Sequence, residues 1–418
     1  MFPPMKVSPI PTLIVLTVLA ATYSVRADFW PEFRGAQANG HAEDTDAPTK
    51  WSSSKNIRWE VDVPGKAWSS PVVADGKIFI TTAVEDGKKL LLETRCYQLS
   101  DGSPVWEKIV FEKEAKNIHK KNSHASPTPV YEDGVVYVHF GHNGTAALNA
   151  TTGGILWTQT DLEYSPVHGN GGSPAVFEDK LIFSCDGQAN PFVVALNKKN
   201  GSVMWKTPRD VEVSRTFSFS TPLLVEVSGK TQAIIPGSGA VISYDPTTGK
   251  EIWRFDYDEG YSVVPRPIYH NGKVYVCSGF GRAILHAIRV DGTGDVTETH
   301  LAWKNEKAIP KESSPIIVEG LLYINDDKGI LSCFDAETGE EVYRERLDEA
   351  GGYSSSPVYA GGHLYFHNGE GVTTVVKPGR EFDKVEENNL REYGLSSFAV
   401  VSDGFVVRTE DHLFRIGE

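Results

Sequence analysis

The chain has 418 residues, 40% of them hydrophobic and 11% aromatic, with 39 Gly, 24 Pro and a formal net charge of −14. This composition supplies a large apolar core and excludes a disordered chain. The acidity excludes a nucleic-acid partner, which requires a basic face. The four cysteines (Cys96, Cys185, Cys277 and Cys333) are too widely spaced for a CxxC zinc site or a haem-attachment motif. Each lies in its own strand-like segment, so we expect buried free thiols.

The first 27 residues have the features of a secretory signal peptide. Lys6 precedes an apolar run from Leu13 to Ala21, and Val25-Arg26-Ala27 matches a cleavage site. The run is shorter than the roughly 20 apolar residues that span a bilayer, so we expect cleavage after Ala27 rather than a membrane anchor. The sequence thus predicts an exported protein, periplasmic or secreted, with one mature domain over residues 28–418.

A Ser/Thr-Pro step followed by a short apolar strand and a Gly turn recurs along the chain. Ser69-Ser70-Pro71 precedes the first such strand, and the later prolines follow at intervals of 42 to 56 residues. These prolines are Pro127, Pro174, Pro222, Pro267, Pro315 and Pro357, and Ser397-Phe398 takes the eighth place. Repeats of 40–50 residues made of strands and Gly turns are typical of propeller blades.

Tryptophan repeats with nearly the same period. Six of the nine tryptophans are 47 to 51 residues apart, and Tyr343 takes the next position. They are Trp59, Trp106, Trp157, Trp205, Trp253 and Trp303. We expect a structural role for them, packing an outer strand between neighbouring blades, with a Thr-Gly hairpin turn before each strand.

Each repeat predicts four antiparallel strands. In the repeat that begins at Ser220, the expected strands are Pro222–Val227, Ala233–Pro236, Ala240–Tyr244 and Glu251–Phe255. The last repeat has only three, Ala399–Ser402, Phe405–Arg408 and Leu413–Ile416, and lacks its Trp strand. Ile57–Val61 near the start of the chain can supply that strand. The sequence therefore predicts one all-β, eight-bladed propeller whose last blade is closed by the N-terminal strand.

Two segments interrupt the regular pattern. Glu112–Lys121 carries the one helix-like signal and lengthens the first interval, so we interpret it as an insertion in a loop. Asp291–Glu298 spaces oxygen side chains like part of a calcium loop, but Val296 occupies the position of the sharp-turn glycine. A long hairpin turn is the favoured interpretation of this second segment, and we predict no metal site.

The segment Tyr244-Asp245-Pro246-Thr247-Thr248-Gly249-Lys250-Glu251-Ile252-Trp253 resembles the pyrroloquinoline-quinone (PQQ) propeller repeat. Similar segments end at Trp157, Trp205 and Tyr343, so the resemblance covers essentially the whole mature chain. The opening Trp30-Pro31-Glu32-Phe33-Arg34-Gly35 is similar to that of exported PQQ-like propellers of planctomycete-type bacteria.

The resemblance implies two functional classes. Quinoprotein dehydrogenases bind PQQ and a metal in the central funnel, whereas BamB-like scaffolds of the outer-membrane β-barrel assembly machinery carry no cofactor. The quinoprotein alcohol dehydrogenases have adjacent cysteines under the cofactor and are longer, but this chain has no Cys-Cys pair and no haem motif. No catalytic base or calcium cage can be matched residue by residue. We therefore expect no cofactor, and PQQ with calcium is the alternative.

Polar residues are predicted to gather at one face of the ring. The links from an outer strand to the next inner strand, and the turns between second and third strands, open on the same face around the axis. From these links and turns we predict a ligand site, with no catalytic residue assigned. Its candidate residues are His124, His168, Asn170, Arg215, Arg266, Arg282 and Asp326. A wider set in the same loops includes Lys66, Trp68, His119, Lys311, Glu312 and Tyr353.

The sequence favours a non-catalytic binding or protein-interaction scaffold. Its expected partner is a protein or a small anionic or sugar-like molecule that binds at this face of the ring, because convergent polar groups in a concave site favour ligand binding. Recruitment to the outer-membrane assembly machinery is a further possibility, and we expect a monomer. The alternative is a PQQ-dependent dehydrogenase that oxidises alcohols or sugars.

Overall fold

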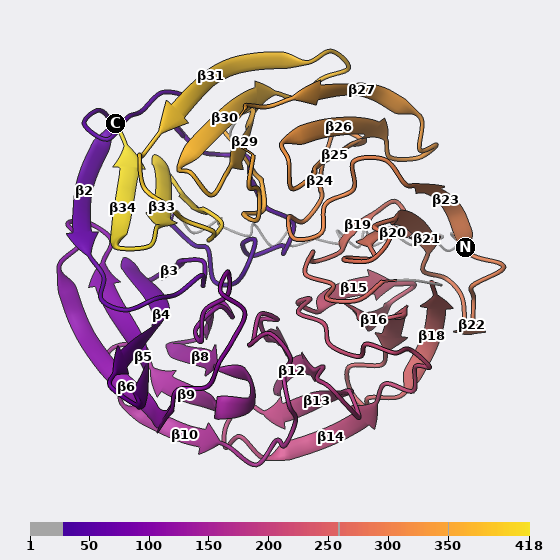
Figure 1. The fold of residues 1–418 in the computed structure, drawn as a ribbon, viewed down its shortest axis with the longest axis horizontal. Coiled ribbons are helices and arrows are strands. Elements are labelled where there is room, and N and C mark those ends of the chain that lie inside the picture. Colours follow the sequence, from indigo (N-terminus) through magenta and orange to yellow (C-terminus); the bar gives the residue numbers. More distant parts are fainter. Residues whose placement is uncertain (1–27, 258–259, 350) are drawn as a thin grey trace, which may run out of the picture.

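The computed structural model describes residues 28–257, 260–349 and 351–418, so the predicted signal peptide and its cleavage site lie outside the described residues. Eight sheets surround a common centre in chain order (Figure 1). The predicted all-β, eight-bladed propeller is therefore confirmed. The only helical segment in the described ranges is the 3₁₀ turn η1 (Gly141–Asn143). None of the described helices is long and apolar enough to cross a membrane.

Every blade runs from an inner strand beside the axis to an outer strand at the rim. Blade 1 consists of β3 (Val72–Ala74), β4 (Lys77–Asp86), β5 (Lys89–Gln98) and β6 (Pro104–Glu114). Blade 2 consists of β7 (Val130–Glu132), β8 (Val135–His139), β9 (Thr145–Asn149) and β10 (Ile155–Gln159). Blade 3 consists of β11 (Ala175–Phe177), β12 (Lys180–Cys185), β13 (Phe192–Asn197) and β14 (Val203–Pro208). Blade 4 consists of β15 (Leu223–Val227), β16 (Lys230–Pro236), β17 (Ala240–Tyr244) and β18 (Glu251–Asp256).

The second half of the ring repeats this plan. Blade 5 consists of β19 (Ile268–His270), β20 (Lys273–Cys277), β21 (Leu285–Arg289) and β23 (Leu301–Asn305). Blade 6 consists of β24 (Ile316–Val318), β25 (Leu321–Asn325), β26 (Ile330–Asp335) and β27 (Glu341–Arg346). Blade 7 consists of β28 (Val358–Ala360), β29 (His363–His367), β30 (Val372–Lys377) and β31 (Asp383–Asn389). Blade 8 consists of β32 (Ala399–Val401), β33 (Gly404–Arg408), β34 (His412–Gly417) and β2 (Ile57–Asp62).

Both ends of the described chain complete blade 8. Strand β2 pairs antiparallel with β34, from Ile57 opposite Ile416 to Asp62 opposite His412 (Figure 1). The predicted closure is thus confirmed, and the four strands expected in blade 4 match the observed ones within a few residues at their ends. Closure pairs what would otherwise be an open edge between the first and last blades.

Two details of the sequence-based interpretation are wrong. Residues 112–114 extend β6 and residues 115–121 contain no helix, because the insertion lengthens β4, β5 and β6 into an extended hairpin. The proline that starts blade 2 is Pro129 rather than Pro127. The hydroxyl of the residue before it, Thr128, accepts a backbone N–H from the preceding blade, as the Ser70 hydroxyl does in blade 1. Asp291–Glu298, as expected, connects two strands, β21 and β23, and its short strand β22 (Gly294–Asp295) pairs with β18 of blade 4.

Five of the six periodic tryptophans join their blade to the next by a hydrogen bond. The Trp205 indole donates a hydrogen bond to Pro246 O of the next blade at 3.0 Å. A Cβ placed on Gly249 would lie 2.5 Å from the Trp205 ring, so only glycine leaves room for it. The same indole-to-carbonyl bond and glycine contact recur at Trp59, Trp106, Trp157 and Trp303. The predicted packing role is confirmed for these five tryptophans, each of which packs on the turn glycine before the outer strand of the next blade, in a Thr-Gly, Asp-Gly or Asn-Gly step.

The cysteines fulfil the expectation from the sequence. All four are free and buried, each in a different blade. Burial raises the pKa of Cys96 and of Cys333 to about 12, which keeps these thiols protonated and unreactive.

Candidate functional site

A circle of side-chain hydroxyls surrounds the propeller axis where the inner strands begin. In seven of the eight blades the residue before the first strand's proline or phenylalanine donates its backbone N–H to the hydroxyl of the equivalent residue in the next blade. The bonds from Ser70 to Thr128, Thr128 to Ser173 and Ser173 to Thr221 measure 2.9–3.0 Å. Those from Arg266 to Ser314, Ser314 to Ser356, Ser356 to Ser397 and Ser397 to Ser70 measure 2.8–3.1 Å. The recurrent Ser/Thr-Pro step therefore closes the ring as well as starting each strand.

Arg266 interrupts this hydroxyl circle. It offers no acceptor to the N–H of Thr221, and its Nε and Nη2 instead donate to Pro222 O at 3.1 and 2.8 Å. Its Nη1 donates to Phe33 O at 2.5 Å and lies 3.3 Å from Oε1 of Glu32. Arg266 thus fastens the N-terminal segment inside the ring.

That N-terminal segment crosses the axis from blade to blade. Trp30 bridges Val73 of blade 1, and Arg34 donates to Pro315 O between blades 5 and 6. Further on, β1 (His41–Ala42) pairs in parallel with β28 of blade 7. Phe33 of this segment is one of the residues that line the central pocket.

A central pocket of about 630 Å³ opens on the face where the linkers between blades lie, which we call the funnel face. All eight linkers contribute to its lining, and the turn between β20 and β21 adds Phe280. Six hydroxyls of the circle (Ser70, Thr128, Ser173, Thr221, Ser356 and Ser397) line it, and five of them, all but Ser356, make no donor bond to the protein in the described ranges. A volume of this size can enclose a small ligand.

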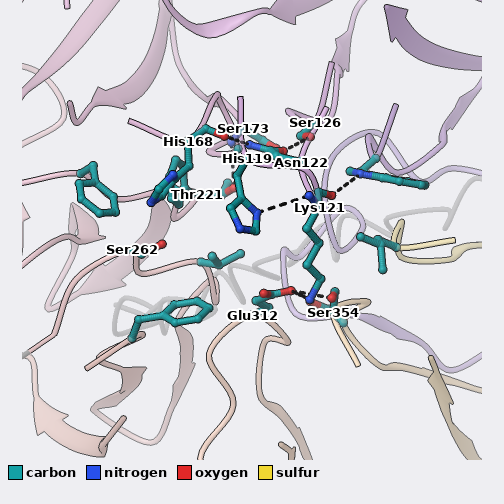
Figure 2. Close-up of a pocket in the computed structure, with 18 of the residues that line it drawn as sticks. His119, Lys121, Asn122, Ser126, His168, Ser173, Thr221, Ser262, Glu312 and Ser354 are labelled. Carbon is teal, nitrogen blue, oxygen red and sulfur yellow. Dashed lines mark hydrogen bonds and ion pairs between the residues drawn. The ribbon is translucent and has the colours of Figure 1, made fainter. Parts of the chain in front are cut away.

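Basic side chains outnumber acidic ones in this pocket. His119, Lys121, His168 and Arg215 line it, and Glu312 is the one carboxylate among the lining residues (Figure 2). Lys121 Nζ lies 2.7 Å from Oε2 of Glu312, to which the Ser354 hydroxyl also donates at 2.5 Å. The pocket therefore concentrates positive charge in a chain whose net charge is −14.

The two histidines lie side by side, with ring centroids 5.4 Å apart. The backbone N–H of His119 donates to His168 O, and the Asn122 amide donates to the same carbonyl at 2.9 Å (Figure 2). Burial and the neighbouring His119 lower the pKa of His168. Protonation of His168 would add positive charge to the pocket at acidic pH.

Aromatic rings form the walls between these polar groups. Arg215 stacks over Tyr261 with its Cζ 4.3 Å from the ring centroid, and the His168 ring meets Phe217 edge-on at 5.0 Å. Two lysines that do not line the pocket lie over rings that do. Lys66 Nζ is 5.4 Å from the ring centroid of Trp68, and Lys311 Nζ is 5.3 Å from that of Phe280. The walls thus combine apolar faces with nearby positive charge.

The structure brings two of the seven candidate residues, His168 and Arg215, into the central pocket. His124 is buried with its Nδ1 unpartnered, and Arg282 is exposed and ion-paired with Glu306. Asp326 accepts backbone bonds from Lys328 and Ile330 within its own turn. These residues and Arg266, whose hydrogen bonds are described above, lie outside the lining, so their ligand role stays a prediction without support from the pocket.

The remaining candidate, Asn170, lies beside a second, much smaller cavity of about 10 Å³. Its amide donates to Phe140 O, and its Oδ1 has no partner. Asp186 lines the same cavity and forms a buried ion pair with Arg209 at 3.7 Å. Burial raises the pKa of Asp186 to about 6, against the opposing charge of Arg209. This cavity has room for about one water molecule.

The sequence interpretation missed the hydroxyl circle, Phe33 and Lys121 as parts of the site. The sequence shows the hydroxyl residue before most of these prolines, but that pattern by itself predicts only the number of blades. His119, Trp68 and Glu312 belonged to the wider predicted set and do line the pocket. Phe33 could not be placed, because its position depends on where the N-terminal segment crosses the ring.

The pocket does not offer the donor set that the quinoprotein resemblance implies. Over the described ranges, no group of three or more His, Cys, Asp or Glu side chains is placed to hold a metal ion. Glu312 is engaged by Lys121 and Ser354, and the cysteines lie apart in four blades. The residues present thus do not fit a PQQ–calcium site of that kind.

Comparison with known proteins places this architecture in a family. The profile of the family described as outer membrane protein assembly factor BamB matches residues 83–222 and 295–377, more than half of the chain. The chain belongs to this family. Its BamB-like propeller fold is consistent with a protein-interaction scaffold.

Individual relatives of this BamB-family propeller come from both functional classes. It is 24% identical to outer membrane protein assembly factor BamB of Yersinia pestis over 63% of this chain and 61% of that protein. It is 33% identical to quinoprotein ethanol dehydrogenase of Pseudomonas aeruginosa, over only 32% of this chain and 23% of that enzyme. The chain thus spans less than two thirds of the length of these relatives. The crystal structure of BamB from Moraxella catarrhalis superposes with a TM-score of 0.59 at 14% identity, covering 86% of this chain and 96% of that one.

Proposed function

We propose that the protein is an exported, non-catalytic propeller that binds a partner on its funnel face, with the central pocket receiving part of the bound molecule. The pocket is the observation that carries this proposal, because all eight linkers converge on it. The proposed location is the periplasm or the cell exterior, as the predicted signal peptide implies, and the proposed state without a partner is monomeric.

The outer-membrane assembly machinery is the proposed protein partner. Membership of the BamB family supports this choice, and so does the similarity to BamB along most of this chain. An acidic surface with a basic central pocket would dock a partner that presents acidic groups to the pocket and basic groups to the surface around it.

Co-purification with the barrel-inserting subunit of the same organism tests this proposal. The variant Lys120→Glu reverses an exposed charge in the funnel-face linker of blade 2 and is expected to weaken the complex at least fivefold. Lys250→Glu is the matched control, because this exposed lysine lies in the turn before β18 on the opposite face. Failure of the purified protein to bind the insertase, or equal effects of the two variants, would contradict docking on the funnel face.

A PQQ-dependent dehydrogenase remains the second candidate, favoured by the 33% identity to a quinoprotein ethanol dehydrogenase. Purified protein would be mixed with PQQ and Ca²⁺ and assayed for dye-linked oxidation of alcohols and sugars. We expect no turnover and no change in absorbance or melting temperature. Turnover above that of a PQQ–Ca²⁺ blank would overturn the non-catalytic proposal.

A further inference from the structure

Five hydroxyls of the pocket lining have hydrogens free to bind a ligand. The oxygens of Ser70, Thr128, Ser173, Thr221 and Ser397 each accept a backbone N–H from the preceding blade. In the described part of the chain, none of these five hydroxyls donates to a protein acceptor of its own. A hydroxyl carries one donor as well as its acceptor lone pairs, so each hydrogen remains available on the side away from the incoming N–H.

This arrangement favours a ligand that accepts several hydrogen bonds in the pocket. The blade-closing bonds already occupy the oxygens as acceptors, so the circle offers donors preferentially. Carboxylate, sulfate and phosphate groups have several acceptor oxygens and no competing donors when ionised. An oxyanion is therefore the chemical group that the circle fits best.

Charge in and around the pocket points the same way. Lys121, Arg215 and the two histidines face one carboxylate, Glu312. The buried guanidinium group of Arg266 donates to O of the lining residue Phe33 and pairs with Glu32, and the next residue, Arg34, is buried as well. Burial and the charge of Arg266 lower the pKa of Arg34 to about 9, so Arg34 stays charged at neutral pH.

We propose that the central pocket is a binding site for a small hydroxylated oxyanion, a sugar acid of the hexuronate type. Its carboxylate meets the hydroxyl circle, its hydroxyls donate to Glu312 and Ser126, and its apolar ring faces pack on Tyr261 and Phe217. This inference deepens the proposed function and rests on it only in taking the funnel face as the binding face.

The mixture of lining groups separates a sugar acid from a simpler anion. Inorganic sulfate or phosphate would use the hydroxyl circle and the cations but not the aromatic walls. A neutral sugar would use the walls but not the positive charge. Because the pocket combines both within about 630 Å³, a molecule that carries both features should bind best.

Titration calorimetry of the purified protein, without any partner, tests the inference with D-glucuronate, D-glucose and inorganic sulfate as probes. Glucuronate is expected to bind saturably, with glucose and sulfate each at least tenfold weaker. No binding of glucuronate, or equal binding of glucuronate and glucose, would overturn the inference. Tight binding of PQQ that excludes glucuronate would also overturn it, in favour of a cofactor site.

Three variants sharpen this test. Arg215→Ala is expected to weaken glucuronate binding about tenfold and to leave glucose binding nearly unchanged. Arg380→Ala, which removes an exposed arginine near the Asp335 turn on the opposite face, is the matched control and should have no effect. Glu312→Gln should tighten glucuronate binding severalfold, because it frees Lys121 and removes a negative charge, while the amide oxygen of Gln still accepts from the ligand's hydroxyls.

A weaker complex of glucuronate with Glu312→Gln would contradict the proposed arrangement of charge. The outcome of these titrations is separate from that of the partner assay. Loss of insertase binding in Lys120→Glu with normal glucuronate binding would support the scaffold function and the ligand site independently. Failure of glucuronate to bind, with the insertase complex intact, would remove only the ligand site.

Discussion

The two interfaces between blade 4 and its neighbours, here called seams, show how one sequence position can serve two structural roles. At the seam between blades 3 and 4, the Trp205 indole crosses to Pro246 O and packs on Gly249. At the seam between blades 4 and 5, the equivalent Trp253 donates instead to Gln232 within its own blade at 2.8 Å. Both tryptophans are buried, but only the first one joins two blades by its hydrogen bond.

The cause of this difference lies in blade 5. In its connection from β21 to β23, Thr293-Gly294 does not receive the Trp253 ring, because Gly294 belongs to β22, which pairs with the edge of β18. The same seam also loses the inter-blade hydroxyl bond, because Arg266 replaces Ser or Thr. Backbone pairing at the rim and a guanidinium at the axis therefore replace the two standard contacts, which shows that a seam can be closed by different chemistry at the same blade geometry.

Replacement of Arg266 should have the largest effect on this comparison. Arg266→Ser restores the hydroxyl of the other seams but leaves Glu32 without its cation and Phe33 O without its donor. Because a buried carboxylate loses its partner, we expect the free energy of unfolding to fall by about 3–5 kcal/mol. Denaturant unfolding measures this change.

The double variant Arg266→Ser/Glu32→Gln provides the control. It removes the uncompensated charge and should recover part of the loss. A single variant as stable as the parent protein would show that the hydroxyl and the guanidinium are equivalent at this seam.

Gly249→Ala should have the next largest effect, at the other seam. The new Cβ would lie 2.5 Å from the Trp205 ring, at a residue whose φ is +73°. Strain and displacement of the indole should together lower the free energy of unfolding by about 3 kcal/mol. Thermal and denaturant unfolding would detect the change.

Gly229→Ala is the matched control, because Gly229 has a φ of +76° but open space around its Cβ position. We expect a loss of only about 1 kcal/mol from the backbone conformation alone. Equal losses in the two variants would mean that tryptophan packing does not explain the glycine at the regular seams.

The closure of blade 8 should show a smaller effect that depends on pH. His412 Nδ1 lies 2.7 Å from Glu392, and its Nε2 lies 3.1 Å from Asp62 and 3.5 Å from Glu60 on β2. Burial opposes the charge of His412, but the hydrogen bond to Glu392 and the three carboxylates outweigh it and raise the pKa. The charged histidine thus holds the closing strand, in contrast to the uncharged contacts at the blade 3–4 seam.

His412→Gln should therefore destabilise the protein more at pH 6 than at pH 9. A raised pKa in the folded state gives a stabilisation that is fully present below the ordinary pKa of about 6.5 and is lost as the pH rises through the folded-state value. We expect a loss of about 0.5–1 kcal/mol at pH 6 and almost none at pH 9, measured by urea unfolding. A loss independent of pH would indicate a packing role for the ring instead.

The pattern of repeats allowed much of the fold to be predicted. The spacing of Pro and Trp gave the eight blades, and the missing strand of the last repeat predicted the pairing of β2 with β34. Such features are readable because each blade is a local unit whose turns and strands depend on nearby residues. The helix-like signal of residues 112–121 did not produce a helix: residues 112–114 pair with β5, and residues 115–121 belong to the linker between blades 1 and 2.

The site was predictable only in part. His168 and Arg215 follow from the rule that linkers meet at the funnel face, and both line the pocket. The same rule could not show that Asp326 is satisfied within its own turn or that Arg282 is held by Glu306. Whether a polar loop residue points to the axis depends on side-chain directions and on contacts between loops from different blades.

By itself the sequence determined the fold, the order of the blades and the way the ring closes, because these follow from periodic local signals. Only the tertiary structure decided that the repeated Ser/Thr-Pro and Thr-Gly motifs form the contacts between neighbouring blades. It also decided that Arg266 binds the N-terminal segment and that five hydroxyl donors line the pocket. The physical reason is that these groups lie tens to hundreds of residues apart in the chain, and their positions are fixed only when the eight blades close around one axis.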